Sequence, residues 1–327
     1  MKIINWGIIA TGHIASRFAR EFPSVKNARL YAVGSRKLSR ARSFALKYNI
    51  PKYYGSYQSL VNDIDIDAVY VATPHNLHRD NTISALKAGK SVLCEKPFAI
   101  NALEALDMVT LARKKNLFLM EAMWARFNPA LVKLQQILGK RLIGEVLHLR
   151  ADFGFFAKYN PVHRLFNPYL GGGALLDVGV YPLSLASMIF GNPINIKSAA
   201  AFGKTGVDEQ NSILLEYQKN KIAQLSSAII LDTDREAHIA GTKGSIKLDA
   251  SWHRSLKVTV MIRDKNDIIY EFDEKHNGLH HEVLHMMNCI RSGKKESTIM
   301  SLDESLSIMK TMDTIRAQWN LTYPMEK

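Results

Sequence analysis

The hydrophobic and polar positions of the chain follow two different patterns, which change near residue 124. In the first part, short apolar runs alternate with stretches in which apolar residues recur at helical spacing. This alternation of strand and helix is typical of βαβ units in a parallel sheet. The predicted strands are Ile4 to Ile9, Leu30 to Val33, Ala68 to Ala72, Ser91 to Cys94 and Phe118 to Met120.

The part after Trp124 contains longer strand-like runs that are joined by turn-like links. Consecutive strands without helices between them indicate a largely antiparallel sheet. Helices are predicted at Pro129 to Leu138, Leu279 to Arg291 and Leu302 to Trp319. The predicted strands are Glu145 to Phe153, Ile194 to Phe202, Ile213 to Tyr217, Ile222 to Ile230, Ile246 to Leu248 and Leu256 to Ile262.

Together, the two patterns predict an α/β protein of two domains. We expect residues 1–123 to form a doubly wound parallel sheet of the Rossmann type. Residues 124–327 are expected to form an α+β domain on a large, mostly antiparallel open sheet. A chain of 327 residues with 47% hydrophobic residues has enough apolar surface for two such domains.

Charge and cysteine content narrow the functional class. The net charge of +13 suits a polyanion, but the 43 basic residues are spread without an arginine-rich block, which favours a phosphorylated ligand over nucleic acid. Cys94 and Cys289 make neither a disulfide framework nor a metal-ligand set, so we expect a reducing cytoplasm. The chain opens directly with a strand, and no later apolar run is expected to span a bilayer; neither secretion nor membrane insertion is predicted.

A dinucleotide-binding turn is predicted after the first strand. The segment Ala10-Thr11-Gly12-His13-Ile14-Ala15 matches the fingerprint G-x-G-x-x-G/A, with alanine in place of the first glycine. Gly12 would let the backbone approach a pyrophosphate, and the helix start supplies oriented amides and a favourable dipole. The alternative is an ordinary turn from strand to helix.

The end of the second strand favours NADP over NAD. An acidic residue usually holds the adenosine ribose hydroxyls there, but this chain has Ser35-Arg36-Lys37, with Arg40 close behind. A serine hydroxyl and guanidinium groups suit a 2′-phosphate. The alternative is a solvated basic face at the start of a helix.

Two polar segments follow the next buried strands, at the edge where ligands bind in open α/β sheets. The first, Thr73-Pro74-His75-Asn76-Leu77-His78, could line the nicotinamide ribose, or its histidines could cap a helix. No carboxylate or cysteine stands near it at ligand spacing, so no metal site is expected. The second, Glu95-Lys96-Pro97, presents an ammonium group that can polarise an oxygen or lower a neighbour's pKa.

The second domain offers a glycine turn that leads into a helix. In the stretch Gly171 to Tyr181, Asp177 and Tyr181 are expected one helical turn apart on one face. Trp124 and Arg126 could contact the nicotinamide, or they could make a structural contact between the domains. Weaker substrate candidates, or core residues in the case of the aromatics, are His163, Arg164, Phe153, Phe155, Phe156 and Tyr159.

As an ordered set, these motifs resemble the glucose-fructose oxidoreductase and inositol dehydrogenase family over nearly the whole chain. The motifs are Ala72 to His78, Glu95-Lys96-Pro97, and Gly172-Gly173 followed by Asp177-x-Gly179-x-Tyr181. Three further segments are most similar to dimeric dihydrodiol dehydrogenases and NADP-dependent D-xylose dehydrogenases: Glu121 to Phe127, Arg164 to Pro168, and Ile315 to Gln318.

The resemblance implies a Rossmann domain followed by a substrate domain whose open sheet commonly forms a subunit interface, hence a homodimer or homotetramer. It also implies a cis peptide before Pro97. Many family members have histidine where this chain has Tyr181. Tyrosine at this position is typical of the dihydrodiol and glucose-fructose branches, which disfavours inositol as the substrate.

The predicted mechanism is hydride transfer with Tyr181 as the general acid and base. Free tyrosine has a pKa of about 10, and the ammonium group of Lys96 would lower it. Asp177 would accept hydrogen bonds from substrate hydroxyls or orient the lysine. The alternatives are a core aromatic for Tyr181 and, for Asp177, a helix N-terminal residue favoured by the dipole.

The leading functional hypothesis is an NADP-dependent oxidoreductase for a small polyhydroxylated compound, either an aldose such as D-xylose or a trans-dihydrodiol. One alternative is an NAD-dependent glycoside hydrolase that regenerates its cofactor in each turnover. The other is a non-catalytic NADP-binding sensor, which the presence of both Lys96 and Tyr181 disfavours.

Overall fold

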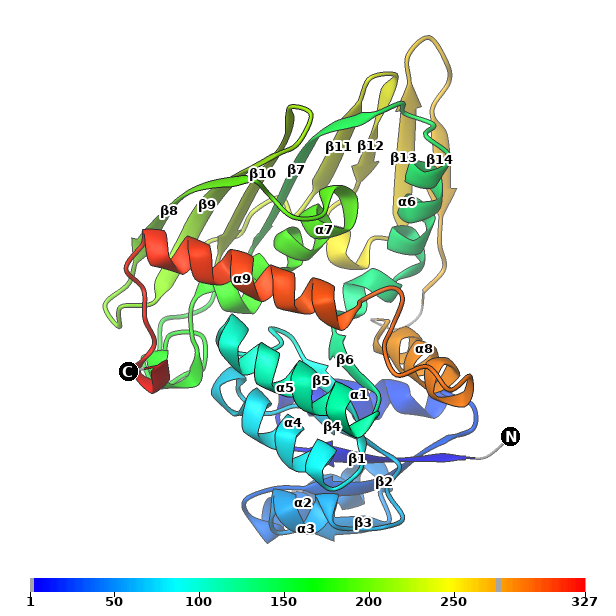
Figure 1. The fold of residues 1–327 in the computed structure, drawn as a ribbon, viewed down its shortest axis with the longest axis vertical. Coiled ribbons are helices and arrows are strands. Elements are labelled where there is room, and N and C mark those ends of the chain that lie inside the picture. Colours follow the sequence, from blue (N-terminus) through cyan, green and yellow to red (C-terminus); the bar gives the residue numbers. More distant parts are fainter. Residues whose placement is uncertain (1–2, 275–277, 327) are drawn as a thin grey trace. The chain divides into compact units, whose positions relative to one another are not determined.

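The computed structural model describes residues 3–274 and 278–326, which divide into two compact units (Figure 1). The first unit comprises the described residues 3–124 and 278–306, and the second comprises 125–274 and 307–326. Each unit is built on one of the two predicted kinds of sheet, which confirms the α/β fold class.

The first unit holds a six-stranded parallel sheet in the order β3-β2-β1-β4-β5-β6. The order reverses next to β1, as in doubly wound dinucleotide-binding folds. The strands are β1 Ile4–Ile9, β2 Ala28–Gly34, β3 Lys52–Tyr54, β4 Ala68–Val71, β5 Ser91–Glu95 and β6 Leu119–Ala122. The helices are α1 His13–Glu21, α2 Leu38–Tyr48, α3 Tyr57–Val61, α4 His78–Lys87, α5 Ala102–Lys115 and α8 Leu279–Arg291.

Buried central strands and capped helices account for this sheet. All of β4 and all but the first residue of β5 are buried, as expected for parallel strands that are covered on both faces. Helices α4 and α5 lie side by side (Figure 1). At the start of α5, the Asn101 Oδ1 accepts a 2.9 Å hydrogen bond from the Glu104 amide and so caps the helix.

The helix α8 belongs to the first unit, whereas the sequence assigned all of 124–327 to the second domain. It packs against α1. The Leu279 amide donates a 2.9 Å hydrogen bond to the Glu21 carboxylate, and the Leu119 amide donates to the Lys295 carbonyl at 3.4 Å. The periodic pattern of α8 predicts a helix but not which sheet its apolar face covers, so this return of the chain could not be seen from local pattern.

The second unit holds an eight-stranded sheet in the order β14-β13-β12-β11-β7-β10-β9-β8. All neighbours are antiparallel except β7 and β10. The strands are β7 Val146–Gly154, β8 Asn195–Phe202, β9 Asp208–Tyr217, β10 Lys221–Ala228, β11 Ala237–Gly241, β12 Gly244–Leu248, β13 Lys257–Ile262 and β14 Ile268–Glu271. Two helices, α6 Pro129–Gly139 and α7 Val180–Phe190, belong to this unit, as does most of α9 Leu302–Gln318.

One face of this sheet is covered and the other is open. Buried and more exposed positions alternate along β9 and β10. The π-helix Leu175–Gly179 and the helix α7 pack on β7 and β10. These two helical segments carry the predicted catalytic residues of the second unit.

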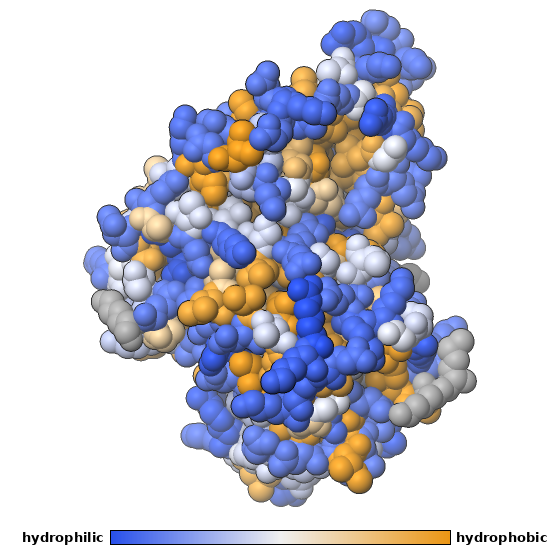
Figure 2. All heavy atoms as spheres, viewed as in Figure 1, coloured by the Kyte–Doolittle hydropathy of each residue, from blue (hydrophilic) through white to orange (hydrophobic). Residues whose placement is uncertain are grey.

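One described helical stretch, Pro168–Phe190, is long and apolar enough to cross a membrane. The sequence-based expectation that no such run exists was wrong on length and composition. Within the structure, 78% of its most apolar window is buried, which is typical of the core helix of a globular protein. On the face drawn in Figure 2, hydrophilic residues are in the majority and hydrophobic residues are interspersed among them.

Candidate active site

The loop between β1 and α1 has a backbone that suits a dinucleotide. Ala10 has a φ of +92°, a conformation that favours glycine, the residue that the fingerprint has there. Gly12 caps α1 without a side-chain hydrogen bond, and a Cβ added to it would meet no atom within 4 Å. Thr11, His13 and Ile14 follow the same turn, and none of them is buried. An anionic pyrophosphate fits this open helix start.

The end of β2 presents basic groups to solvent. Arg36, Lys37 and Arg40 are exposed, whereas Ser35 is buried and its Oγ accepts a 3.4 Å hydrogen bond from the Lys37 amide. Burial raises the pKa of Tyr57, and the nearby Arg36 guanidinium opposes this rise. The exposed side chains of Arg36, Lys37 and Arg40 are compatible with the binding of an adenosine that carries a phosphate.

The segment after β4 contains both a structural histidine and an acceptor that suits a ligand. The His78 ring is fully buried, with Nδ1 2.8 Å from the Pro97 carbonyl and Nε2 3.0 Å from the Thr73 carbonyl. Burial lowers the pKa of His78 to about 4. The ring thus ties together the segments that follow β4 and β5, and its cofactor contact remains a prediction.

The neighbouring Asn76 has a buried Oδ1 without a hydrogen-bond partner among the residues that the structure describes. Asn76 lies in the short helix His75–Leu77, which Pro74 precedes as the N-cap residue. A buried acceptor without a donor is costly unless a ligand or water supplies one. A cofactor hydroxyl would supply such a donor, so the fit of Asn76 to the predicted nucleotide is good.

The motif after β5 places two charged residues in different settings. Glu95 is buried at the end of the strand and accepts a hydrogen bond from the Tyr70 hydroxyl. Burial raises the pKa of Glu95, although Lys96 and Tyr70 oppose the rise. The Lys96–Pro97 peptide is cis, which confirms that expectation. Lys96 lies in the first unit, whereas Asp177 and Tyr181 lie in the second.

Asp177 lies in the π-helix Leu175–Gly179, where the sequence predicted an α-helical turn. The Val180 amide donates to the Leu175 carbonyl five residues back, so this turn is wider than an α-helical one. The Asp177 carboxylate is 5% exposed and lies 2.7 Å from Arg164 Nη1. Arg164 was predicted only as a weak substrate candidate, and here it holds a predicted catalytic carboxylate.

Tyr181, the second residue of α7, lies among aromatic side chains. Its ring centroid lies 5.2 Å from that of Phe153 and 5.6 Å from that of His253, and these two rings stack at 4.2 Å. His253 stands in no sequence motif, so it was not predicted; only the fold brings the residues after β12 to α7. Of the other aromatic residues predicted as substrate candidates or core residues, Phe155 packs on a small apolar cluster, while Phe156 and Tyr159 are exposed.

The two residues predicted to contact the nicotinamide at the start of the second domain are both buried. Trp124 is 3% exposed, and the Arg17 guanidinium lies 5.9 Å from its ring centroid. Arg126 is 2% exposed, and its Nε donates a 2.8 Å hydrogen bond to the Ser184 hydroxyl of α7. Arg126 therefore supports the helix that carries Tyr181, and its contact with a cofactor remains a prediction.

Comparison with known proteins assigns both units. Residues 4–123 match the oxidoreductase family with an NAD-binding Rossmann fold, and residues 131–247 match the GFO/IDH/MocA C-terminal domain. The chain is 37% identical over 330 residues to trans-1,2-dihydrobenzene-1,2-diol dehydrogenase of Xenopus tropicalis, with 98% of this chain and 99% of the relative covered.

Solved structures share the whole fold. An aldose-aldose oxidoreductase from Caulobacter crescentus is similar with a TM-score of 0.87 at 24% identity, over 97% of each chain. A 3-ketoreductase from Actinomadura kijaniata in complex with NADP is similar with a TM-score of 0.84 at 25% identity, over 96% of this chain and 97% of that one.

A parallel dinucleotide-binding sheet followed by a mostly antiparallel open sheet defines a class of nicotinamide-dependent oxidoreductases. The chain belongs to the GFO/IDH/MocA oxidoreductase family, which confirms the resemblance seen in its motifs. The protein is accordingly an enzyme of the oxidoreductase class that binds a nicotinamide cofactor.

Proposed function

We propose that this enzyme is an NADP-dependent dehydrogenase that oxidises a CH–OH group of a trans-dihydrodiol or of an aldose such as D-xylose. One observation carries the proposal: a relative named for the dihydrodiol reaction matches 98% of the chain. The hydroxyl-bearing ring of Tyr181, set among Phe153 and His253, supports it, because aromatic walls suit the C–H face of a cyclic diol or sugar.

The proposed chemistry needs a base for the substrate hydroxyl. A nicotinamide cofactor, held by the turn around Gly12 and by the segment that contains Asn76, would supply the hydride acceptor. Tyr181 takes the hydroxyl proton, and the Lys96 ammonium favours the phenolate, since an opposite charge nearby lowers the pKa of a phenol. Asp177, held by Arg164, accepts hydrogen bonds from the neighbouring substrate hydroxyls.

The preference for NADP is proposed from the end of β2. Arg36 and Arg40 are exposed there, and the buried Ser35 precedes them. A guanidinium group binds a phosphate through paired charge-assisted hydrogen bonds, whereas NAD would require an acceptor for its ribose hydroxyls at this place.

A homodimer or homotetramer is proposed through the open face of the second unit's sheet. A hollow of about 900 Å³ lies over β7 to β10. Its lining mixes charged, hydroxyl and apolar groups, including Arg150, Asp152, Lys197, Ser212, Leu214 and Gln224. Interfaces between subunits combine such groups, and pairing would bury a face that the monomer leaves open.

We also propose that the enzyme works in the cytoplasm. Its two cysteines, Cys94 and Cys289, are both free and buried, and burial raises the pKa of each thiol. Free thiols of this kind are typical of a reducing compartment.

The test is absorbance of reduced nicotinamide with NADP or NAD and a panel of dihydrodiols, aldoses and inositols. We expect NADPH to accumulate with diols or aldoses, and kcat to fall at least about 100-fold in Lys96→Ala and in Tyr181→Phe. Matched controls are Lys87→Ala and Tyr169→Phe, whose parent residues are exposed and should leave kcat unchanged.

Three outcomes would contradict parts of this proposal. Cofactor binding without net reduction across the panel would indicate the self-regenerating hydrolase or a sensor. A tight equilibrium preference for NAD would contradict the cofactor assignment, and full turnover by a Lys96→Ala, Tyr181→Phe double variant would contradict the mechanism.

A further inference from the structure

A buried carboxylate supports the segment that carries the predicted catalytic residues of the second unit. Asp208, the first residue of β9, is fully buried. Its Oδ2 accepts a 2.7 Å hydrogen bond from the amide of Leu175, the first residue of the π-helix. The same oxygen accepts from Asn211 Nδ2 at 2.9 Å, and Asn211 Oδ1 accepts from the Ser227 hydroxyl at 2.9 Å.

The glycine turn before the π-helix is shaped around this carboxylate. Gly173 has a φ of +117°, and a Cβ at this position would lie 2.2 Å from Asp208 Oδ1. Only glycine fits such a conformation and such a close approach. On the other side, the buried Tyr323 hydroxyl donates a 2.6 Å hydrogen bond to the Gly172 carbonyl. The turn is therefore held by one residue from β9 and one from the C-terminal segment.

We propose that Asp208 is a positioning residue for hydride transfer, which fixes Leu175 and the glycine turn and thereby orients the segment that presents Asp177 and Tyr181. This rests on the proposed function. The carboxylate acts through the backbone of the π-helix, whose first amide it binds. A small displacement of a catalytic group can lower a rate by about 100-fold, so this support matters for turnover.

The ionisation of Asp208 sets the strength of this support. Burial raises its pKa to about 7, although hydrogen bonds from Leu175 and Asn211 oppose the rise. The charged and titratable groups that face it are Arg316 of α9, which also lowers its pKa, and Tyr323, whose own pKa is raised by burial and by Asp208. A carboxylate accepts stronger hydrogen bonds than a neutral acid does. The hydrogen bond from the Leu175 amide to Asp208 should therefore become stronger as pH rises through about 7.

The direction of the reaction separates this effect from that of Tyr181. Oxidation needs a deprotonated tyrosine and reduction needs a protonated one, so the Tyr181 contribution changes sign between the two directions. Ionisation of Asp208 should raise kcat in both directions, because its carboxylate positions the same segment for oxidation and for reduction. We therefore expect an ascending step in kcat near pH 7 in oxidation and in reduction.

The experiment compares the wild-type enzyme with Asp208→Asn and measures two quantities. The first is kcat against pH in both directions, where we expect a loss of about 10- to 100-fold and no step near pH 7 in the variant. The second is the amide proton resonance of Leu175, which should titrate with a midpoint near pH 7 in the wild type and not in the variant. The exposed Asp267→Asn is the matched control and should change neither.

The NMR measurement does not depend on turnover, so the two proposals can fail separately. If no substrate in the panel reacts while the Leu175 amide titrates, the proposed function fails and the role of Asp208 in holding the Leu175 amide stands. If Asp208→Asn does not fold, Asn211→Ala replaces it; loss of this donor should move the Leu175 midpoint and the kcat step to higher pH. A Leu175 resonance that does not titrate, or wild-type kcat profiles in Asp208→Asn, would overturn the proposal.

Discussion

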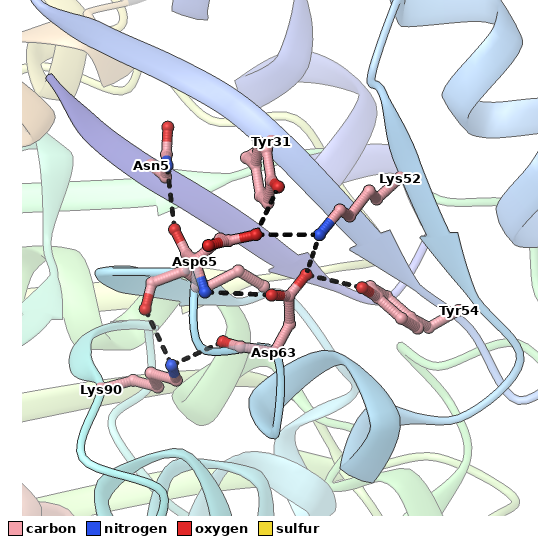
Figure 3. A network of polar contacts seen from close by, with 8 residues as sticks. Asn5, Tyr31, Lys52, Tyr54, Asp63, Asp65 and Lys90 are labelled. Carbon is pink, nitrogen blue, oxygen red and sulfur yellow. Dashed lines mark hydrogen bonds and ion pairs between the residues drawn. The ribbon is translucent and has the colours of Figure 1, made fainter.

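The Rossmann unit contains two groups of acidic side chains that differ in their surroundings and in their charge. The first group, the aspartate network, consists of Asp63 and Asp65, which shortly precede β4, and of the side chains that donate hydrogen bonds to them (Figure 3). Lys52 Nζ lies 3.1 Å from both carboxylates. The Tyr54 hydroxyl donates to Asp63 at 2.6 Å, and the Tyr31 hydroxyl donates to Asp65 at 2.8 Å.

These donors hold both aspartates in the charged form. Burial raises the pKa of Asp63, but hydrogen bonds from Tyr54, the Asp65 amide and Lys52 outweigh it, so its pKa is lowered. Hydrogen bonds from Tyr31 and then Lys52 lower the pKa of Asp65. The lysine ammonium thus neutralises part of the charge of both carboxylates.

The second group, the glutamate cluster, consists of Glu21, Glu95, Glu121 and Glu282, each at most 5% exposed. Both carboxylate oxygens of Glu282 are buried without a hydrogen-bond partner among the described residues. Burial raises the pKa of Glu282 well above its ordinary value, and the neighbouring Glu95, Glu21 and Glu121 raise it further. Available donors, rather than the number of carboxylates, therefore decide which acidic group is charged.

The largest effect is expected from breaking the aspartate network. Asp63→Ala removes the acceptor of Tyr54 and one of two partners of Lys52, so we expect a loss of about 3 kcal/mol of unfolding free energy at pH 7. Urea denaturation measures it. The stabilisation by a carboxylate of lowered pKa is present above the unfolded pKa of about 3.9 and is lost as pH falls through the folded one. The difference in unfolding free energy between Asp63→Ala and the wild type should therefore become smaller at acidic pH.

The control within the same network is Asp65→Ala. Its side chain is 53% exposed, against 6% for Asp63, and solvent weakens exposed ion pairs, so we expect a smaller loss of unfolding free energy than in Asp63→Ala. Equal losses for the two variants would show that burial does not distinguish the two aspartates.

The opposite sign is expected for the glutamate cluster. Glu282→Leu removes a buried acid without a donor, so we expect a gain of about 1 to 3 kcal/mol at pH 7. A carboxyl of raised pKa keeps its proton in the folded state while the unfolded chain releases it above about pH 4.3, so stability falls as pH rises. The gain should therefore shrink toward pH 4.

Thermal and urea unfolding of Glu282→Leu at several pH values would check this gain. Asp80→Asn is the surface control, because the Asp80 side chain is 71% exposed; it should change stability by no more than about 0.5 kcal/mol. A loss of stability in Glu282→Leu at pH 7 would mean that the carboxylate is ionised and stabilised in the folded enzyme.

The contrast between the two acidic groups also shows what the sequence could predict. Buried apolar runs and helical periodicity located the central strands, because burial on both faces imposes that pattern. The short strands β3, β11 and β14 were missed, since segments of three to five residues are too short to show a clear hydrophobic period. The same periodic pattern predicted α8 but could not show that it would bury Glu282.

The candidate site divides in the same way. Lys96 and Tyr181 stand in motifs whose residue order is visible in the chain. His253 and Asp208 stand in no motif. Only the packing of the short helix Trp252–Arg254 and of β9 in the second unit brings them to α7 and to the π-helix. Local pattern thus finds residues that a turn or strand end presents, and it misses those that tertiary packing adds.

The smallest effect is expected inside the glutamate cluster, where Glu95 differs from Glu282 by having one donor. Tyr70→Phe removes that donor and keeps the ring, which stacks on Phe18 at 3.9 Å. We expect a loss of about 1 kcal/mol in unfolding free energy at pH 7, measured in urea. The Tyr70 hydrogen bond lowers the pKa of Glu95, so the variant should raise this pKa further, and the loss should be smaller at pH 5 than at pH 7.

The matched control for Tyr70→Phe is Tyr217→Phe. Tyr217 is 4% exposed, and its hydroxyl has no hydrogen-bond partner among the described residues. Removing a buried hydroxyl that lacks a partner should be neutral or slightly stabilising at every pH. If Tyr70→Phe behaves like this control, or if its cost is the same at pH 5 and pH 7, then the hydroxyl of Tyr70 does not stabilise the Glu95 carboxylate. Glu95 and Glu282 would then both be neutral, and the contrast in charge between the glutamate cluster and the aspartate network would be greater.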